Sequence, residues 1–351
     1  MKIIFTICSN NYLSQAKTLG DSLLVHNPDY TFIIGLTDEF DERIDYGLFS
    51  PHIILPVKNI GILQFDDLWK KYDIVEFNTC VKASYFKYIF SAYPKANNVC
   101  YFDPDIVVYH SLSILEEAFL ENEILITPHV LSPVEIDDKH PSEYTFLNFG
   151  LYNLGFIGVH RNCTLQAGFL NWWENRILTL GYNKPCDGLY VDQLWINLVP
   201  IFFEKVILLK NIGLNVAPWN LHERTVLHTI DNKYKMNDGS PLYFFHFSSY
   251  NYKNIDALSK YYSRYSFETH KELKKLYIEY NVKLVGNKID DFEKIECIYI
   301  SRQKKYISDK NSWSSKINYI FLKTKQQLKW LLPVSVLKAI KKTAAINNSD
   351  I

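Results

Sequence analysis

Residues 99–108 read Val99-Cys100-Tyr101-Phe102-Asp103-Pro104-Asp105-Ile106-Val107-Val108. An apolar strand runs directly into two aspartates, and Pro104 lies between them. Proline lacks the backbone N–H that a central strand must donate, so the regular strand is expected to stop here. The two carboxylates are therefore expected at the edge of a sheet, which is where open α/β folds bind their ligands.

Short apolar runs alternate with longer amphipathic stretches before this segment, which is typical of βαβ units and a mostly parallel sheet. Beyond about residue 110 the alternation weakens. The predicted strands are Lys2–Cys8, Tyr30–Leu36, His52–Pro56, Val99–Phe102, Ile124–Thr127, Asn153–His160 and Val206–Leu209. The predicted helices are Tyr12–His26, Phe77–Ala92 and Thr164–Leu180. The sequence thus predicts an α/β fold, with a mostly parallel central sheet flanked by helices.

Composition excludes several classes of protein. The 351 residues are 48% hydrophobic, enough for a substantial core, and 38 basic residues balance 38 acidic ones, which offers no support for a nucleic-acid partner. The six cysteines form no CxxC pair, so reduced thiols are expected. The apolar run Ile3-Ile4-Phe5 is too short for a signal peptide, and no membrane-spanning run occurs. We expect a cytoplasmic protein.

The aspartate pair has the spacing of a metal site. Carboxylates at Asp103 and Asp105 can reach one hard divalent cation, which also accepts phosphate oxygens. Such pairs are also common in turns and helix caps, but carboxylates beside buried strands usually have a partner. His246, in the aromatic run 242–250, is a candidate third ligand that would suit Mn²⁺ better than Mg²⁺. The alternative for His246 is a core histidine with one hydrogen bond.

Six segments carry a resemblance to a known family. They are Asn78–Lys82, Tyr101–Asp105, Asn153–Gly158, Asp192–Asn197, Asn215–His222 and Phe245–Ser248. Most are loose individually, and their shared order over roughly residues 2–250 makes the match specific. In this order the chain resembles bacterial glycosyltransferases of the GT-A type, especially those akin to glycosyltransferase family 8.

The resemblance implies a metal and a nucleotide-sugar. Asp103, Asp105 and His246 would hold Mn²⁺, or Mg²⁺, on the diphosphate of a UDP-sugar donor. The loop after the first strand would cradle uracil and ribose, with a tyrosine as the candidate for base stacking. The residues implied in this loop are Thr6, Cys8, Asn11 and Tyr12.

Further residues are implied around the donor sugar. Lys82 would direct a basic side chain toward the nucleotide-sugar, unless it is a solvated lysine on a helix face. Asn153 and Gly155 would touch the donor sugar, although a structural turn explains a glycine equally well. Asp192 would accept hydrogen bonds from sugar hydroxyls, or else begin a helix, and Gln193 would lie beside the anomeric carbon.

The sequence also departs from the family pattern. The glycine expected after the His-Phe pair is replaced by Ser248 and Ser249, and no clear Lys-Pro-Trp follows. The phosphate contacts of that loop are therefore open, and Lys253 is a candidate substitute.

The implied activity is transfer of a hexose or N-acetylhexosamine from a UDP-sugar to a glycan or lipid-linked acceptor, with retention of configuration, in surface polysaccharide biosynthesis. No side chain stands out as a general base. One alternative is a phosphatase of the haloacid dehalogenase type, which also carries two aspartates separated by one residue. In that class the pair normally lies near the start of the domain, whereas here it lies at residues 103 and 105. A GT-A-like protein that binds nucleotide or glycan without turnover is the non-enzymatic alternative.

The expected organisation has three parts. Residues 1–250 would form the GT-A domain, with a nucleotide-binding half over 1–110 and an acceptor-side half over 111–250. A helical extension would cover 251–300. The basic tail 301–351 interleaves lysines with apolar residues from Trp313 to Lys342. Such a tail would either lie on the anionic inner face of the cytoplasmic membrane or pack on the domain as a helix.

Overall fold

The computed structural model describes residues 1–229 and 233–310. The chain divides into two compact units, Met1–Ile300 and Ser301–Ile351. The predicted membrane-contacting stretch from Trp313 to Lys342 lies outside the described residues. No helix within the described ranges is long and apolar enough to span a bilayer.

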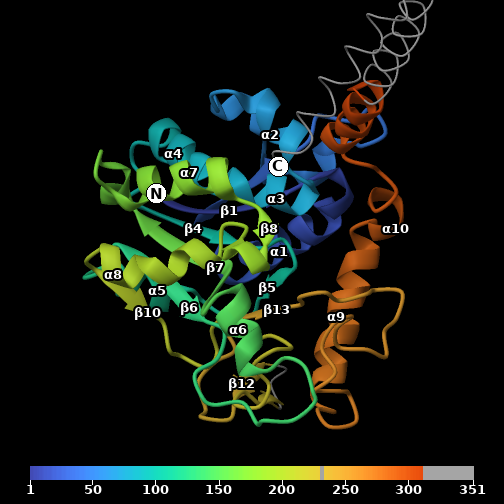
Figure 1. Ribbon diagram of the computed structural model, residues 1–351. Coiled ribbons are helices and arrows are strands. Elements are labelled where there is room, and N and C mark those ends of the chain that lie inside the picture. Colours follow the sequence, from blue (N-terminus) through green and yellow to red (C-terminus); the bar gives the residue numbers. More distant parts are fainter. Residues whose placement is uncertain (230–232, 311–351) are drawn as a thin grey trace, which may run out of the picture. The chain divides into compact units, whose positions relative to one another are not determined.

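A seven-stranded sheet forms the centre of the first unit (Figure 1). Every strand is parallel to the others except β7, which is antiparallel to both of its neighbours. In spatial order the strands are β10 (Val206–Leu208), β6 (Ile124–Pro128), β7 (Tyr152–His160), β4 (Asn98–Phe102), β1 (Lys2–Cys8), β2 (Tyr30–Leu36) and β3 (Ile53–Pro56). This confirms the predicted fold class. The carboxyl ends of β1, β2, β4 and β6 consequently meet along one edge of the sheet.

Helices cover both faces of the sheet. The α-helices are α1 (Leu13–His26), α2 (Phe65–Lys71), α3 (Ile74–Cys80), α4 (Lys82–Ala92), α5 (Ser113–Ala118), α6 (Glu143–Phe149), α7 (Phe169–Leu180), α8 (Val199–Phe202), α9 (Leu273–Gly286) and α10 (Ile289–Phe292). Short 3-10 helices are Asn10–Tyr12, Tyr46–Phe49, Val57–Ile60, Arg161–Thr164, Pro185–Asp187 and Leu194–Leu198. Helices α4 and α7 pack on one face, and α1 and α5 on the other.

Strand β1 shows why the sheet is buried on both sides. Its side chains alternate, so Ile3 and Phe5 join the core with α4 and α7, whereas Ile4 joins the core with α1. The flanking side chains are apolar on both faces because a parallel sheet covered by helices has no solvated side. This continuous apolar run made β1 and β2 predictable to the residue.

Three two-stranded ladders accompany the main sheet, and one of them follows directly on the carboxyl end of β4. Strand β5 (Ile106–Val108) resumes after the aspartate pair and pairs antiparallel with β13 (Phe244–His246), with His246 opposite Ile106. The other ladders pair β8 (Asn183–Lys184) with β9 (Leu189–Tyr190) and β11 (Val226–His228) with β12 (Tyr234–Met236).

Two predicted helices begin differently in the structure. The segment predicted as one helix over Phe77–Ala92 belongs to two helices. Helix α3 begins before Phe77, because Asp73 and Glu76 form a capping box at its start, and Val81 separates α3 from α4. The helix predicted over Thr164–Leu180 begins at Phe169. The preceding residues form a 3-10 turn and then a tight turn that ends at Gly168, the N-cap of α7.

Residues 251–300 belong to the same compact unit as residues 1–250. Helix α9 packs its Tyr277 and Tyr280 against the aromatic residues around β13. The rings of Phe247 and Tyr280 stack with centroids 3.9 Å apart. This helix therefore supports the strand that carries His246.

Candidate metal and substrate site

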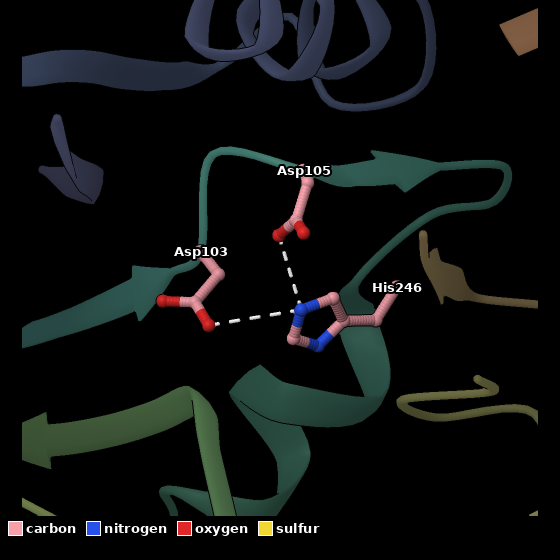
Figure 2. Close-up of side chains that lie close together, drawn as sticks. All are labelled: Asp103, Asp105 and His246. Atoms are coloured by element: carbon pink, nitrogen blue, oxygen red, sulfur yellow. Dashed lines mark ion pairs between the residues drawn. The ribbon is translucent and has the colours of Figure 1, made fainter. Parts of the chain in front are cut away.

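The aspartate pair lies on a tight turn between β4 and β5. The amide of Asp103 donates to the carbonyl of Gly155 on β7 at 2.8 Å, which holds the end of β4 in the sheet. The amide of Ile106 donates back to the carbonyl of Asp103 at 3.2 Å, which closes the turn around Pro104. Both carboxylates consequently point to the same side of the chain (Figure 2).

His246 reaches the carboxylates through strand pairing. Because β13 lies beside β5, the imidazole projects between the two aspartates (Figure 2). Its Nε2 lies 3.0 Å from Oδ1 of Asp105 and 3.7 Å from Oδ2 of Asp103. One ligand atom from each residue lies within 4.8 Å of the others. The structure thus brings together all three residues that the sequence predicts as metal ligands.

The electrostatics of this cluster indicate missing positive charge. Burial raises the pKa of Asp103, although Lys82 and His246 oppose that shift. Burial alone would lower the pKa of His246, but the carboxylates of Asp105 and Asp103 outweigh it and the pKa is raised. Two partly buried carboxylates held side by side repel each other unless a cation compensates them.

The donor set fits a divalent cation. Two carboxylate oxygens and one imidazole nitrogen suit Mn²⁺, and Mg²⁺ less well. Nδ1 of His246 is buried and has no hydrogen-bond partner among the described residues, so on this side the ring is positioned by packing. Trp219 holds it edge to face, with ring centroids 5.1 Å apart.

Gly155 is the second contact that positions the imidazole. A Cβ at this position would lie 2.4 Å from Cε1 and 2.6 Å from Nδ1 of His246, closer than real atoms approach. The backbone of β7 therefore lies against the ring, and only glycine leaves room for it. The structure supplies this reason for Gly155 in addition to the contact with a donor sugar that the resemblance implies.

Lys82 and Asp192 form a buried ion pair beside the metal cluster. Nζ of Lys82 lies 2.5 Å from Oδ2 of Asp192, and each side chain is only 2% exposed. The ammonium also donates to the carbonyl of Leu154 at 3.0 Å and lies 4.0 Å above the ring of Tyr101. The Tyr101 hydroxyl in turn donates to Oδ1 of Asp103 at 2.6 Å. Lys82 is therefore not a solvated lysine on a helix face.

Asp192 precedes the 3-10 helix Leu194–Leu198 but is committed to Lys82. Burial raises its pKa, and Lys82 opposes that shift. Gln193 is fixed at both ends of its amide: Nε2 donates to the carbonyl of Phe149 at 2.8 Å, and Oε1 accepts from the amide of Leu154 at 3.0 Å. Both side chains are thus held rigidly at the wall of the site.

Asn153 belongs to a buried polar network that sequence analysis missed. Its Oδ1 accepts from the Gly155 amide at 3.1 Å and from Nδ2 of Asn215 at 3.0 Å. Its Nδ2 lies 3.3 Å from Nε2 of His129, and Asn215 also donates to Thr127 at 2.9 Å. Burial lowers the pKa of His129 to about 4, so this imidazole is neutral at pH 7. The position of His129 in the sequence could have indicated a site residue, because His129 directly follows β6 just as Asp103 directly follows β4.

The four predicted nucleotide-loop residues lie in different environments. Thr6 and Cys8 are buried within β1, and burial raises the pKa of the Cys8 thiol. Asn11 accepts a hydrogen bond from Ser9 at 2.6 Å. Tyr12 is 45% exposed and lines the large cavity, which the other three do not.

This cavity has a volume of about 750 Å³ and opens at the carboxyl edge of the sheet. Its size lies within the range of small-molecule sites, about 300–1,000 Å³. The predicted site residues on its wall are Tyr12, Lys82, Asp103, Asp105, Asn153, Gly155, Asp192, Gln193 and His246. Lys253, the candidate phosphate residue, is not on this wall and is paired with Glu293; Lys260 lines the cavity instead.

No protein-family model matches the chain. Among curated proteins it is similar to two uncharacterised proteins of Bacillus subtilis (strain 168). It is 26% identical to YfnF over 260 residues, covering 73% of this chain and 84% of YfnF. It is 25% identical to YfnD over 179 residues, covering 50% of this chain and 54% of YfnD. Both relatives are named as uncharacterised, so neither brings an activity to this chain.

Solved structures of glycosyltransferases are also similar. The galactosyltransferase LgtC, in complex with donor and acceptor sugar analogues, is 17% identical, with a TM-score of 0.47 over 80% of this chain and 95% of LgtC. Mouse xyloside xylosyltransferase 1 is 13% identical, with a TM-score of 0.43 over 70% of this chain and 97% of that protein. These identities and scores are too low to assign a chemistry to this chain.

Proposed function

We propose that this chain is a metal-dependent glycosyltransferase of the GT-A type, which moves a hexose or N-acetylhexosamine from a UDP-sugar to a glycan or lipid-linked acceptor. One observation carries the proposal. Asp103, Asp105 and His246 lie within 4.8 Å of one another, on the wall of a cavity of about 750 Å³ at the carboxyl edge of the sheet. The sequence resemblance to family 8 enzymes, in six ordered segments, supports the same assignment.

The metal ligands would be Asp103, Asp105 and His246. When bound there, a divalent cation supplies charge neutralisation for the leaving diphosphate. Tyr101 orients Asp103 through its hydroxyl, and Gly155 leaves room for the imidazole. These two residues keep the ligand atoms in place before the donor arrives, which is the preorganisation that electrostatic catalysis requires.

The donor sugar would lie against Asp192, Gln193 and Asn153. The carboxylate of Asp192 is held by Lys82 and can accept hydrogen bonds from sugar hydroxyls. The amide of Gln193 is tied to two backbone groups, so it presents a fixed surface beside the reacting carbon. Rigid groups of this kind orient a substrate at little entropic cost.

We propose retention of configuration with the diphosphate itself accepting the acceptor proton. The support lies in the three aspartates and the buried His129 that line the described cavity. Asp103 and Asp105 belong to the metal cluster, and Asp192 is paired with Lys82. His129 has a pKa of about 4 and is therefore a weak base. None of these four groups is therefore suited to act as a general base that removes the proton of the acceptor hydroxyl.

Lys260 is the proposed cation for the diphosphate. Lys82 also lines the cavity but is neutralised by Asp192. Lys260 has an exposed side chain and no ion pair within the described residues. A flexible ammonium on the wall of a phosphate-binding cavity can follow the charge that develops on the leaving group. We therefore propose Lys260, in place of Lys253, as the residue that contacts the donor phosphates.

The two alternative functions make different demands on the site. A phosphatase that attacks through Asp103 would need this carboxylate free to reach a phosphoester, whereas here it lies 3.7 Å from an imidazole on a separate strand. Release of phosphate from simple phosphomonoesters would favour that alternative. A binding protein without turnover has little use for a preformed three-ligand cluster, and donor hydrolysis separates it from an enzyme.

The decisive experiment is a screen of UDP-sugars and other nucleotide-sugars for hydrolysis, with Mn²⁺ and with EDTA. We expect slow, Mn²⁺-dependent release of nucleotide from at least one donor. Asp105→Ala should abolish it, while Asp290→Ala, at an acidic residue outside the cavity, should not. If no donor is hydrolysed above the Asp105→Ala level, the proposed activity is wrong.

We propose a cytoplasmic enzyme of surface polysaccharide biosynthesis that contacts the inner membrane face through its tail. The support is the lysine-rich sequence 301–351, which contains two tryptophans. Deletion after residue 310 should abolish binding to anionic liposomes and leave donor hydrolysis intact. Unchanged liposome binding would contradict the membrane contact.

A further inference from the structure

We propose that the cavity contains an aromatic platform for an uncharged carbohydrate ring of the acceptor, formed by Tyr144, Tyr261 and Tyr262. This inference rests on the proposed glycosyltransferase function. All three tyrosines line the same cavity as the metal cluster. Tyr144 comes from α6, whereas Tyr261 and Tyr262 come from the segment that follows β13.

Tyr144 and Tyr261 are more exposed to solvent than the histidine of the metal cluster. Tyr144 is 57% exposed and Tyr261 is 74% exposed, while His246 is buried. A single exposed tyrosine is ordinary on a protein surface. Two on the wall of one cavity, contributed by segments far apart in sequence, expose aromatic surface to any ligand that enters it.

The segments that carry the platform are clamped together by Arg264. Its guanidinium donates to both carboxylate oxygens of Asp137, at 3.0 and 2.5 Å, and its Nε donates to the carbonyl of Pro141 at 2.9 Å. The backbone amides of Ser263 and Arg264 both donate to the carbonyl of His140, at 3.0 and 2.9 Å. The Arg264 side chain is only 6% exposed.

The clamp makes the platform a preformed site. A bidentate arginine–carboxylate pair fixes both distance and orientation. It lies two residues beyond Tyr262, and α6 begins immediately after the clamped carbonyls, with Ser142 and Thr145 as its capping box. The tyrosines on the two segments are therefore held relative to each other before any ligand binds, which lowers the entropic cost of binding.

The chemistry of the platform selects the ligand class. A pyranose presents a C–H face that packs on an aromatic ring, and its hydroxyls can bond to phenol groups at the rim. The neighbouring cavity residues Pro141, Thr145 and Asn148 are uncharged, and His140 packs its ring edge to face on Tyr144, with ring centroids 6.3 Å apart. Lys260 is the nearby cation, and we have assigned it to the donor diphosphate. Apart from Lys260 and the His140 imidazole, the cavity residues beside the platform offer an anionic acceptor no cationic partner, which favours a neutral sugar.

The test uses the full chain with UDP and Mn²⁺ present. Saturation-transfer NMR would measure binding of neutral methyl glycosides of glucose, galactose and N-acetylglucosamine, with methyl glucuronide as the anionic comparison. The variants are Tyr144→Ala/Tyr261→Ala and the matched Tyr144→Phe/Tyr261→Phe, which keeps both rings. Donor hydrolysis without acceptor is measured on the same samples.

We expect at least one neutral glycoside to bind to the wild type and to the Phe variant. Binding should weaken about tenfold or more in the Ala variant, since each lost ring contact costs a substantial part of the affinity. Mn²⁺-dependent donor hydrolysis should persist in both variants, because neither tyrosine is one of the three metal ligands.

Three results would overturn the platform: no neutral glycoside binds, the Ala variant binds as well as the wild type, or methyl glucuronide binds more tightly than every neutral glycoside. Failure of the proposed function gives a different result. In that case the wild type hydrolyses no nucleotide-sugar, whatever the glycosides do.

Discussion

At the scale of single residues, two positions next to the metal ligands determine where the ligand atoms lie. Gly155 touches the imidazole of His246, and Tyr101 touches Asp103. Neither of these two positioning residues is a metal ligand. Their side chains, or the lack of one, determine whether three ligand atoms from two distant segments can converge.

Gly155→Ala tests the contact with the imidazole. The added methyl group would overlap the ring at 2.4 Å and displace it, so we expect Mn²⁺-dependent donor hydrolysis to fall by about 100-fold. Mn²⁺ binding by electron paramagnetic resonance should weaken in parallel. Gly286→Ala is the matched control, since a Cβ there meets no atom within 4 Å. Full activity in Gly155→Ala would contradict the tight packing.

Lys82→Met tests the buried ion pair. It leaves the Asp192 carboxylate buried without its partner, so the free energy of unfolding should fall by about 3–5 kcal/mol in urea titrations. The double variant Lys82→Met/Asp192→Leu removes both charges and should recover most of that loss. Donor hydrolysis should be lost in both variants. An equally unstable double variant would show that the pair acts through packing.

Part of this site was predictable from the sequence and part was not. Asp103 and Asp105 stood out because carboxylates that follow a buried strand contrast sharply with their neighbours. His246 is a candidate ligand only in combination with these two aspartates, because a lone histidine in an aromatic run is also explained as a core residue. The roles of Asn215 and His129 depend on burial and on contacts between β6, β7 and the segment before β13, and no local pattern records those contacts.

At the scale of elements, pairing decides what the strands can present. Strand β13 is only three residues long, yet it places His246 opposite Ile106, beside Asp105. Strand β1 was predictable to the residue because apolar side chains fill both of its faces. The break between α3 and α4 was not, because Val81 is as apolar as the helix on either side of it.

Arg264→Lys tests the clamp between the two aromatic segments. Lysine keeps the charge but loses the bidentate geometry, so the segments that carry Tyr144 and Tyr261 should separate more easily. We expect the KM for a soluble acceptor to rise about tenfold while donor hydrolysis stays unchanged. Arg43→Lys is the control, because that exposed arginine pairs with Asp41 outside the cavity. Equal effects of the two substitutions would argue against a specific clamp.

At the scale of the whole molecule, residues 295–300 return to the edge of the sheet near the first two strands. The buried carboxylate of Asp38, just after β2, accepts from the amides of Ile298 at 2.9 Å and of Asn10 at 3.3 Å. This carboxylate joins a late segment of the first unit to its earliest loop. This contact could not be predicted from the sequence, because Asp38 lies in a short polar segment with no local sign of burial.

Asp38 should make stability depend on pH. Burial outweighs the two amide hydrogen bonds and raises its pKa to about 6. Between about pH 4 and pH 6 the folded state therefore holds a proton that the unfolded state has released. The free energy of unfolding should fall as pH rises through this window, by about 3 kcal/mol. Urea titrations should show this fall relative to Asp38→Asn, and parallel profiles for the two proteins would contradict it.

The pairing of β5 with β13 also has a consequence for synthesis of the protein. A nascent chain on the ribosome acquires both aspartates early, but the imidazole emerges only after much more of the polypeptide has been translated. Until then the aspartates lack their nitrogen ligand, and metal affinity should be weak. An unfinished chain would thus be unable to consume nucleotide-sugar, so turnover would begin only once the strand that carries His246 has docked.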